Sequence, residues 1–297
     1  MKFQRISVPP IKCQGIKTKL VPFIAESVEW NGEGRWIEPF LGSGVVAFSL
    51  APRSALLADT NPFVIGLYRR IASGELTAQA VRHHLEREGK LLRESGGAYY
   101  YEVRDRFNES GDVLDFLFLN RSCFNGLIRF NRQGKFNVPF NHKPGRFAPA
   151  YITKIVNQVD RLARLAGDRD WEFRVADWRD TLAECRPGDF VYADPPYLGR
   201  FRDYYDSWDD ETTAELLDVL SRSPAGFAFS TWSHNRHRRN PLLDRLPAGC
   251  VVLTTTHFYH LGATEELRNS IEEALVVREG FHRRPPDRPA AAPPAGG

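Results

Sequence analysis

Short apolar runs recur along the chain, each followed by an acidic or turn residue and each separated from the next by a segment long enough for a helix. They occupy residues 35–38, 54–59, 172–177, 189–194 and 226–231. This alternation is typical of a mostly parallel sheet with helices on both faces. Two further β-rich runs, residues 250–256 and 273–277, predict an antiparallel pair at the edge of that sheet. The hydrophobic pattern therefore predicts an α/β fold.

A long stretch between the second and third predicted strands has a different pattern. Residues 74–119 read as helices rich in Leu, Glu and Arg, and a crossover between parallel strands needs far less chain than this. We expect residues 73–164 to form an inserted, mainly helical domain, and residues 1–72 and 165–280 to form the domain that contains the sheet. The Pro- and Ala-rich tail, residues 281–297, has too few packing groups to offset its ordering entropy and is expected to be flexible.

Composition narrows the class of protein. The 297 residues carry a net charge of +3, with 42% hydrophobic and 26% charged residues, which is ordinary globular usage. No apolar run reaches the length of a membrane span, and the polar start lacks a secretory signal, so we expect no membrane association and a cytoplasmic location. The four cysteines have no metal-ligand spacing, so we expect neither a bound metal nor a disulfide framework.

The small net charge conceals an uneven distribution. Residues 116–159 contain seven Lys or Arg and no acid, and residues 219–243 contain four Arg and again no acid, so the remainder of the chain is acidic. Two acid-free basic tracts on an acidic body indicate a local surface for a polyanion rather than general basicity. For either tract alone, a solvated face is the competing interpretation.

Candidate chemistry gathers at the ends of the predicted strands, where open parallel sheets bind ligands. The first strand leads into Glu38–Gly44, in which Gly42 and Gly44 allow the backbone to approach a ligand closely, although a structural turn alone would explain this motif. The second strand ends at Asp59, whose carboxylate suits the hydroxyls of a ribose. Because the chain lacks the third glycine of a dinucleotide fingerprint and any Gly-Lys-Ser/Thr phosphate loop, a nucleoside-like ligand without phosphates fits best.

The fourth strand ends in Asp194-Pro195-Pro196-Tyr197, the most specific feature of the sequence. The two prolines hold the backbone extended and remove two N–H donors, so the carbonyls stay available as acceptors. Together with the carboxylate, they can accept both hydrogens of a planar exocyclic amine while the tyrosine ring stacks on the attached heterocycle. An ordinary strand-to-loop turn is the alternative interpretation.

From about residue 8 to residue 280, the sequence resembles the D12 class of adenine-specific DNA methyltransferases. The resemblance rests on motifs that occur in family order: residues 12–17, 38–44, 58–61, 119–131, 134–140 and 194–197. It implies a Rossmann-like methyltransferase sheet, mostly parallel with antiparallel edge strands, and an inserted DNA-recognition domain that is mainly helical. It also implies S-adenosylmethionine (AdoMet) as the methyl donor, without a metal.

Carried over to this sequence, the resemblance implies an AdoMet pocket. Gly42 and Gly44 would line the methionine end of the cofactor, and Asp59 would hold its ribose. The other residues implied at the cofactor are Cys13, Lys17, Glu38, Phe40, Asp177, Trp178 and Asp194. Lys17 would close the pocket, the segment of Asp177 and Trp178 would flank the cofactor's adenine, and Asp194 would lie where cofactor and target meet.

The expected catalytic residues are those of the Asp194–Tyr197 motif. The Asp194 carboxylate and the Pro195 carbonyl would accept hydrogen bonds from adenine N6, shifting that nitrogen toward sp³ and aiming its lone pair at the methyl group. Alignment of this kind contributes roughly 7–11 kcal/mol when the geometry is near attack. A base inside a duplex cannot reach such a pocket, so the target must be flipped out, and Tyr197 would stack on it.

The first basic tract is expected to contact double-stranded DNA, because its basic residues alternate with asparagines suited to reading base edges. The expected DNA-binding residues are Arg121, Phe124, Asn125, Arg129, Asn131, Arg132, Lys135, Asn137 and Lys143. Phe124 would act beside the space left by the flipped base, with a buried core phenylalanine as the alternative. The second tract, around residues 233–239, is either a second DNA contact or a solvated loop, and Tyr204 and Tyr205 are candidates for a loop over the flipped base.

Other functions remain open from the sequence. One is methylation of another planar amine, cytosine N4 or a protein amide, although such enzymes often carry Ser or Asn in place of Asp194. Another is a DNA-binding relative without catalysis, against which the intact Gly42, Gly44, Asp59 and Asp194 argue. A cognate restriction endonuclease is a partner that the resemblance allows.

Overall fold

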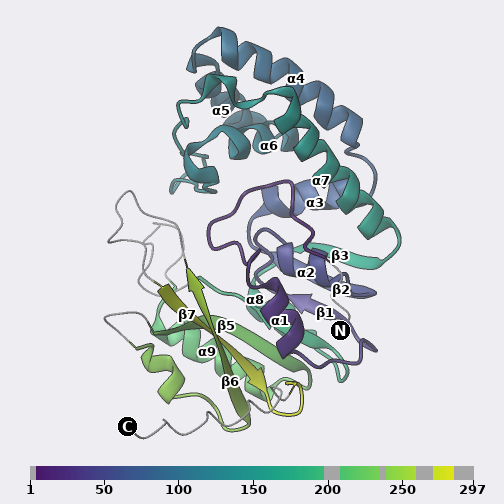
Figure 1. Ribbon diagram of the computed structural model, residues 1–297, viewed down its shortest axis with the longest axis vertical. Coiled ribbons are helices and arrows are strands. Elements are labelled where there is room, and N and C mark those ends of the chain that lie inside the picture. Colours follow the sequence, from purple (N-terminus) through teal and green to yellow (C-terminus); the bar gives the residue numbers. More distant parts are fainter. Residues whose placement is uncertain (1–4, 197–207, 235–238, 259–269, 284–297) are drawn as a thin grey trace, which may run out of the picture.

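The computed structural model describes residues 5–196, 208–234, 239–258 and 270–283. The helical insertion forms one end of the molecule, the sheet and its covering helices form the other, and the N-terminal segment runs between them (Figure 1). Within these residues, no helix is both long and apolar enough to span a membrane. Tyr197, Tyr204, Tyr205, most of the basic loop at 235–239 and the C-terminal tail from residue 284 lie outside the described residues.

The described strands form one sheet in the order β3-β2-β1-β4-β5-β7-β6. They are β1 (Trp36–Glu38), β2 (Ser54–Asp59), β3 (Asp170–Val175), β4 (Phe190–Ala193), β5 (Gly226–His234), β6 (Cys250–Phe258) and β7 (Ser270–Arg278). Strands β1 to β5 pair in parallel, and β7 pairs antiparallel with both β5 and β6. The prediction of a mostly parallel sheet with an antiparallel edge is confirmed.

The third strand begins earlier than its apolar run predicts. Asp170 and Trp171 pair in register with Ser54 and Ala55 of β2, so β3 covers residues 170–175 instead of 172–177. A polar residue can start this strand because β3 lies at the edge of the sheet, where one edge of the strand has no neighbouring strand and several of its side chains are exposed.

Helices cover both faces of the sheet, and consecutive residues of a strand pack into two different hydrophobic clusters. Trp36 belongs to the larger hydrophobic cluster and Ile37 to the smaller one, which α8 and α9 also line. This alternation is the period-2 geometry of a strand that is buried on both faces. The helices around the sheet are α1 (Val21–Ser27), α2 (Val45–Leu50), α3 (Pro62–Ala72), α8 (Trp178–Ala183) and α9 (Asp210–Arg222).

The insertion is mainly helical, as predicted. It contains α4 (Ala78–Glu94), α5 (Ala98–Ser110), α6 (Val113–Ser122) and the short 3₁₀ helices η1 (Phe124–Gly126) and η2 (Pro144–Arg146), and a third 3₁₀ helix, η3 (Pro241–Asp244), follows β5. Helix α7 (Pro149–Gly167) packs on α4 as well as on α3 and β3. The expected boundary at residue 164 therefore falls inside a continuous helix, and the larger hydrophobic cluster extends from the sheet into the insertion.

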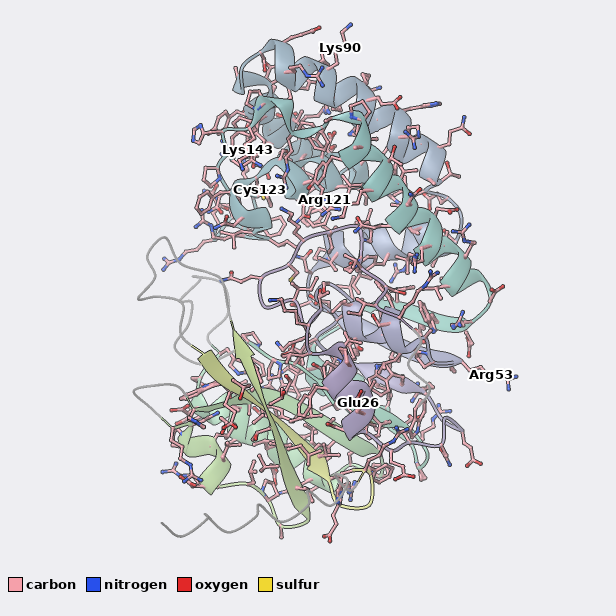
Figure 2. All side chains as sticks on the ribbon, viewed as in Figure 1. Glu26, Arg53, Lys90, Arg121, Cys123 and Lys143 are labelled. Atoms are coloured by element: carbon pink, nitrogen blue, oxygen red, sulfur yellow. The ribbon has the colours of Figure 1, made fainter. Side chains whose placement is uncertain are left out.

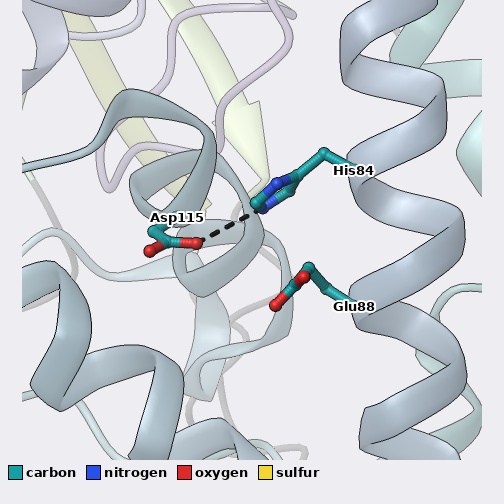
Figure 3. A group of neighbouring side chains, drawn as sticks. All are labelled: His84, Glu88 and Asp115. Carbon is teal, nitrogen blue, oxygen red and sulfur yellow. Dashed lines mark ion pairs between the residues drawn. The ribbon is translucent and has the colours of Figure 1, made fainter.

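An ion-pair network holds the helices of the insertion together. His84 and Glu88 of α4 converge with Asp115 of α6 (Figure 3). Arg106 of α5 donates from Nη2 to Glu88 Oε2 (2.9 Å) and from Nε to Asp115 Oδ2 (2.7 Å), and Arg87 Nε donates to Glu88 Oε1 (2.6 Å). Because the guanidinium groups already neutralise both buried carboxylates, we interpret this cluster as a structural network.

Candidate active site

The carboxyl ends of β1, β2 and β4 meet the N-terminal segment at one place. Cys13 of that segment marks the meeting point, because burial and then the charges of Asp59 and Asp194 raise the pKa of its thiol to about 12. Its sulfur would lie 3.7 Å from a β-carbon added to Gly42. The structure therefore brings together Cys13, Gly42, Asp59 and Asp194, which sequence analysis placed around one ligand.

Asp59, the last residue of β2, organises the glycine turn. Its Oδ2 accepts a hydrogen bond from the backbone N–H of Gly42 (2.8 Å), and its Oδ1 accepts one from the N–H of Asn61 (2.9 Å). A carboxylate oxygen can accept more than one hydrogen bond. Asp59 can therefore hold the turn and still accept hydrogen bonds from ligand hydroxyls.

Gly44 makes the turn into α2 possible. Its φ is +71°, in the left-handed region, and a β-carbon there would lie 2.5 Å from the ring of Phe48. Its N–H donates to the carbonyl of Leu41 at 2.7 Å, which closes the turn. Any other residue would force the turn away from Asp59 and the neighbouring strand ends.

Glu38 is the acid at the end of β1, and the structure places it in the interior. Its Oε1 accepts a hydrogen bond from Trp36 Nε1 (2.8 Å), and its side chain is buried because β1 is a central strand. Burial raises the pKa of Glu38 to about 8, and the charge of Asp194 adds to that rise. Glu38 thus lies near the site with a pKa raised toward neutral pH, and its contact with a cofactor stays a prediction.

Asp194 follows β4 and forms an ion pair with Lys17. The distance from Lys17 Nζ to Asp194 Oδ1 is 2.8 Å, and the two side chains are 5% and 19% exposed. Pro195 is buried and Pro196 is exposed; both line a small recess with Ser230 and Thr231 of β5. The carboxylate is therefore fixed by a cation on one oxygen and by a rigid backbone after it.

Trp178, at the start of α8, does not present its ring at the strand ends. It is buried in the smaller hydrophobic cluster, next to Trp208 at a ring-centroid distance of 6.3 Å. Phe40 is half-buried and packs edge-on against Trp208 (5.3 Å). Asp177 caps α8 by accepting the N–H of Arg179. The fold thus explains all three residues as local packing or capping, and their contacts with a cofactor are untested predictions.

Sequence analysis missed Val175 as a candidate site residue. Val175 pairs in register with Asp59 at the carboxyl end of β3, and it is 46% exposed. An exposed valine at this position offers an apolar surface, suited to a planar heterocycle, beside Asp59, whose contact with a ribose stays a prediction. The sequence carried a weak signal for it, because an apolar residue closes the third predicted run just before Asp177.

The loop after α6 displays Phe124 and Asn125. Phe124 is 50% exposed, which excludes the alternative of a core phenylalanine, and Asn125 has a φ of +54°. Two backbone hydrogen bonds fix the loop to the segment of residues 139–141: the N–H of Phe124 donates to Pro139 O (2.8 Å), and the N–H of Asn141 donates to Ser122 O (3.1 Å). A rigid loop thus presents an aromatic ring to solvent.

The hairpin-like segment from Arg129 to Asn137 uses its own asparagines as structural groups. Asn131 Oδ1 accepts the N–H groups of Gln133 and Lys135 (3.0 Å each), and Asn137 Oδ1 accepts Arg129 Nε (2.8 Å). These bonds orient Arg129. The most exposed of the predicted DNA-binding cations are Arg132, Lys135 and Lys143.

One predicted DNA-binding residue is wrong. Arg121, in the last turn of α6, is only 5% exposed. Its Nη2 donates to Gln158 Oε1 (2.6 Å), and its guanidinium lies 5.4 Å from the ring centroid of Tyr151. Its burial and these two contacts with α7 make Arg121 a structural residue rather than a surface phosphate contact.

Lys12, which sequence analysis did not predict as a DNA-binding residue, lies in a cluster of cations next to Arg121 and Arg146. Burial, and then the charges of Arg146 and Arg121, lower the pKa of Lys12 to about 8, with a smaller contribution from Lys143. Cations this close together without acids between them form a concentrated positive region. Arg121 and Lys143 lie in the part of the insertion that adjoins this N-terminal segment (Figure 2). Lys12 belongs to a motif that carries the family resemblance, which was the signal available in the sequence.

A family model described as D12 class N6 adenine-specific DNA methyltransferase matches residues 14–261. The chain belongs to this family. This membership confirms the prediction of an adenine-specific DNA methyltransferase, an enzyme that acts on DNA. The alternative of a cytosine or protein-amide methyltransferase is no longer favoured.

Curated relatives carry names of the same class. The retron Ec67 DNA adenine methylase of Escherichia coli is 35% identical over 202 residues, which is 65% of this chain and 66% of the relative. Type II methyltransferase M1.LlaDCHI of Lactococcus lactis subsp. cremoris is 26% identical over 288 residues, 92% of this chain and 95% of the relative. The DNA adenine methylase of Serratia marcescens is 34% identical over 168 residues, 54% of this chain and 57% of the relative.

A methyltransferase of this family implies AdoMet, and the charges of the site fit that molecule. AdoMet carries a positive sulfonium and ammonium and a negative carboxylate. The site gathers the carboxylates of Asp59 and Asp194 and the buried ammonium group of Lys17 around Cys13, with Lys17 in contact with Asp194. Acids suit the two positive groups, and Lys17 suits the carboxylate.

Proposed function

We propose that this methyltransferase acts on an adenine flipped out of double-stranded DNA, with Asp194 as the residue that binds and orients the target amine. The observation that carries the proposal is the place of Asp194: it follows a central strand, its charge and that of Asp59 both act on Cys13, and Lys17 fixes one of its oxygens. An acceptor held in this way can direct an amine lone pair toward a methyl group.

The chain's own residues supply positioning. Bound AdoMet supplies a methyl group that is already activated, so the protein needs neither a nucleophile nor a covalent intermediate. Asp59 and the glycine turn would hold the cofactor, and the carboxylate of Asp194 and the carbonyl of Pro195 would accept the two hydrogens of the target amine. Tyr197 is proposed to stack on the base, which is typically worth ~1–3 kcal/mol.

The basic surface is proposed to grip the duplex beside this site. Its members are Lys12, Arg129, Arg132, Lys135 and Lys143, and Phe124 projects from the same part of the insertion. With about five phosphate contacts, the logarithm of DNA affinity should fall against the logarithm of salt concentration with a slope of roughly −4 to −5. A much shallower slope would remove this surface from the interface.

The test is methylation of DNA by the purified protein with AdoMet, followed by mass spectrometry of the nucleosides. The proposal predicts N6-methyladenine and loss of at least about 10²-fold in the rate of methyl transfer at saturating AdoMet for Asp194→Asn, beyond any loss of AdoMet affinity. The exposed Asp168, at the end of α7, gives a matched control, Asp168→Asn, that should behave as wild type. N4-methylcytosine as product, or an unimpaired Asp194→Asn, would overturn the proposal.

A cognate restriction endonuclease is a second proposal, and it rests on the name of the Lactococcus relative, a type II methyltransferase. Its test is whether a nuclease encoded beside this gene cleaves the methylated motif only when it is unmethylated. We place the enzyme in the cytoplasm, with the DNA it modifies.

A further inference from the structure

The ion pair of Lys17 and Asp194 joins the N-terminal segment to the end of β4. Lys17 Nζ lies 2.8 Å from Asp194 Oδ1, and it also donates to the carbonyl of Gly15 (3.2 Å). The backbone carbonyl of Lys17 accepts the N–H groups of Leu20 and Val21 at 2.8 and 3.0 Å, where α1 begins. Lys17 is thus fixed both at its ammonium group and at its backbone.

The other charged and titratable groups around Asp194 oppose its ionisation. The pKa of Asp194 is raised overall from its ordinary value: burial raises it most, the two interactions with Lys17 lower it, and the charge of Glu273 on β7 raises it further. Glu38, on β1, has its own pKa raised by Asp194. Cys13 and Tyr192 also have their pKa values raised by burial and then by nearby charges that include Asp194. Among the described residues, Lys17 is the only cation that acts on this carboxylate.

The ionised form is the one that the reaction needs. An ionised carboxylate only accepts hydrogen bonds, whereas a protonated one has an O–H donor. A donor would compete for the lone pair of the target amine, which must point at the methyl group. The contact of Lys17 with Oδ1 directs the cation to one oxygen and leaves Oδ2 as the acceptor for the amine.

We propose that Lys17 is a positioning residue for methyl transfer, which holds one oxygen of Asp194 and keeps the carboxylate ionised so that its other oxygen accepts the target amine. This rests on the proposed role of Asp194. Lys17 thereby also makes Asp194 a weak base, so that the carboxylate orients the amine and does not remove its proton before the methyl group arrives.

The test is the pH profile of the single-turnover rate of methyl transfer, with AdoMet and DNA saturating. In Lys17→Gln the acidic limb should move upward by about 1–3 pH units, because an opposite charge at this distance lowers a carboxyl pKa by that amount. The rate should recover as the pH rises. Lys17→Arg should keep the limb within about half a pH unit, and the exposed Lys19→Gln, which removes the same charge from the same segment, should match wild type.

A second readout does not depend on activity. In a double-mutant cycle of urea unfolding, Lys17→Gln should destabilise the wild-type protein more than it destabilises Asp194→Asn. Equal effects in both backgrounds would overturn the proposal. So would an unmoved acidic limb in Lys17→Gln with only weaker AdoMet binding, since Lys17 would then serve the cofactor alone.

The failure of the proposed function is distinguishable from the failure of this inference. Full activity of Asp194→Asn would remove the role of Asp194, whatever Lys17 does. If Lys17→Gln does not fold, the wild-type profile still decides, because the proposal requires its acidic limb to lie below neutral pH. A wild-type limb above pH 7 would contradict it.

Discussion

The side-chain amide of Asn120 forms hydrogen bonds with both the N–H and the carbonyl of Lys12. Its Oδ1 accepts the N–H of Lys12 (2.8 Å), and its Nδ2 donates to the carbonyl of Lys12 (2.9 Å). Asn120 is fully buried at the end of α6, directly before the loop that displays Phe124. Asn120 therefore fixes the segment that carries Cys13 and Lys17 to the insertion.

Asn120→Ala should weaken both stability and cofactor binding. It leaves the N–H and carbonyl of Lys12 without their buried partner, which costs about 2 kcal/mol in the free energy of unfolding. Because the released segment carries Lys17, AdoMet affinity should fall several-fold. Urea unfolding and calorimetric titration measure the two effects. Asn157→Ala, an exposed change on α7, is the control, and equal behaviour of the two variants would refute this role of Asn120.

Gly126 lies against the same lysine. Its φ is +68°, and a β-carbon there would lie 2.4 Å from Lys12 Cβ. Gly134 has a similar φ of +73° with no atom within 4 Å of such a β-carbon. Gly134→Ala should therefore cost about 1 kcal/mol from backbone strain alone, and Gly126→Ala should cost at least about 1 kcal/mol more. Thermal unfolding compares them, and equal losses would mean that the contact with Lys12 yields without cost.

DNA binding should weaken as the pH rises through the pKa of Lys12. A lysine is charged below its pKa, and burial with the charges of Arg146 and Arg121 lowers this one to about 8. Affinity should thus fall between about pH 7 and about pH 9, a range in which an ordinary lysine keeps its charge. Lys12→Arg should flatten the profile because arginine stays charged, whereas Lys90→Arg on the exposed face of α4 should leave it unchanged. A profile that Lys12→Arg does not alter would exclude Lys12 from the DNA surface.

Phe124→Ala should impair base flipping without unfolding the protein. The ring is half exposed, so its removal should change stability by less than about 0.5 kcal/mol. A 2-aminopurine placed at the target position should lose its rise in fluorescence on binding, while AdoMet affinity stays the same. Normal flipping by Phe124→Ala would show that another group occupies the vacated stack.

The sequence predicted the sheet better than the insertion. Parallel strands buried on both faces read as apolar runs, so β2 was located at its observed ends, and the Asp194 motif marked the site because prolines and a carboxylate are visible locally. The boundary at residue 164 was not predictable, because α7 packs on both parts of the molecule. The burial of Arg121 by Gln158 and Tyr151, and the pairing of Lys17 with Asp194, depend on residues far apart in the chain. A pattern of residue types along the sequence does not show such contacts.

The most direct measurement is modification-sensitive sequencing of DNA from cells that lack adenine methylation and express this protein. The account predicts N6-methyladenine at one recurrent motif with the wild-type chain and none with Asp194→Asn produced at the same level. DNA without N6-methyladenine from cells that contain folded wild-type protein would contradict it, as would methylation that persists in Asp194→Asn.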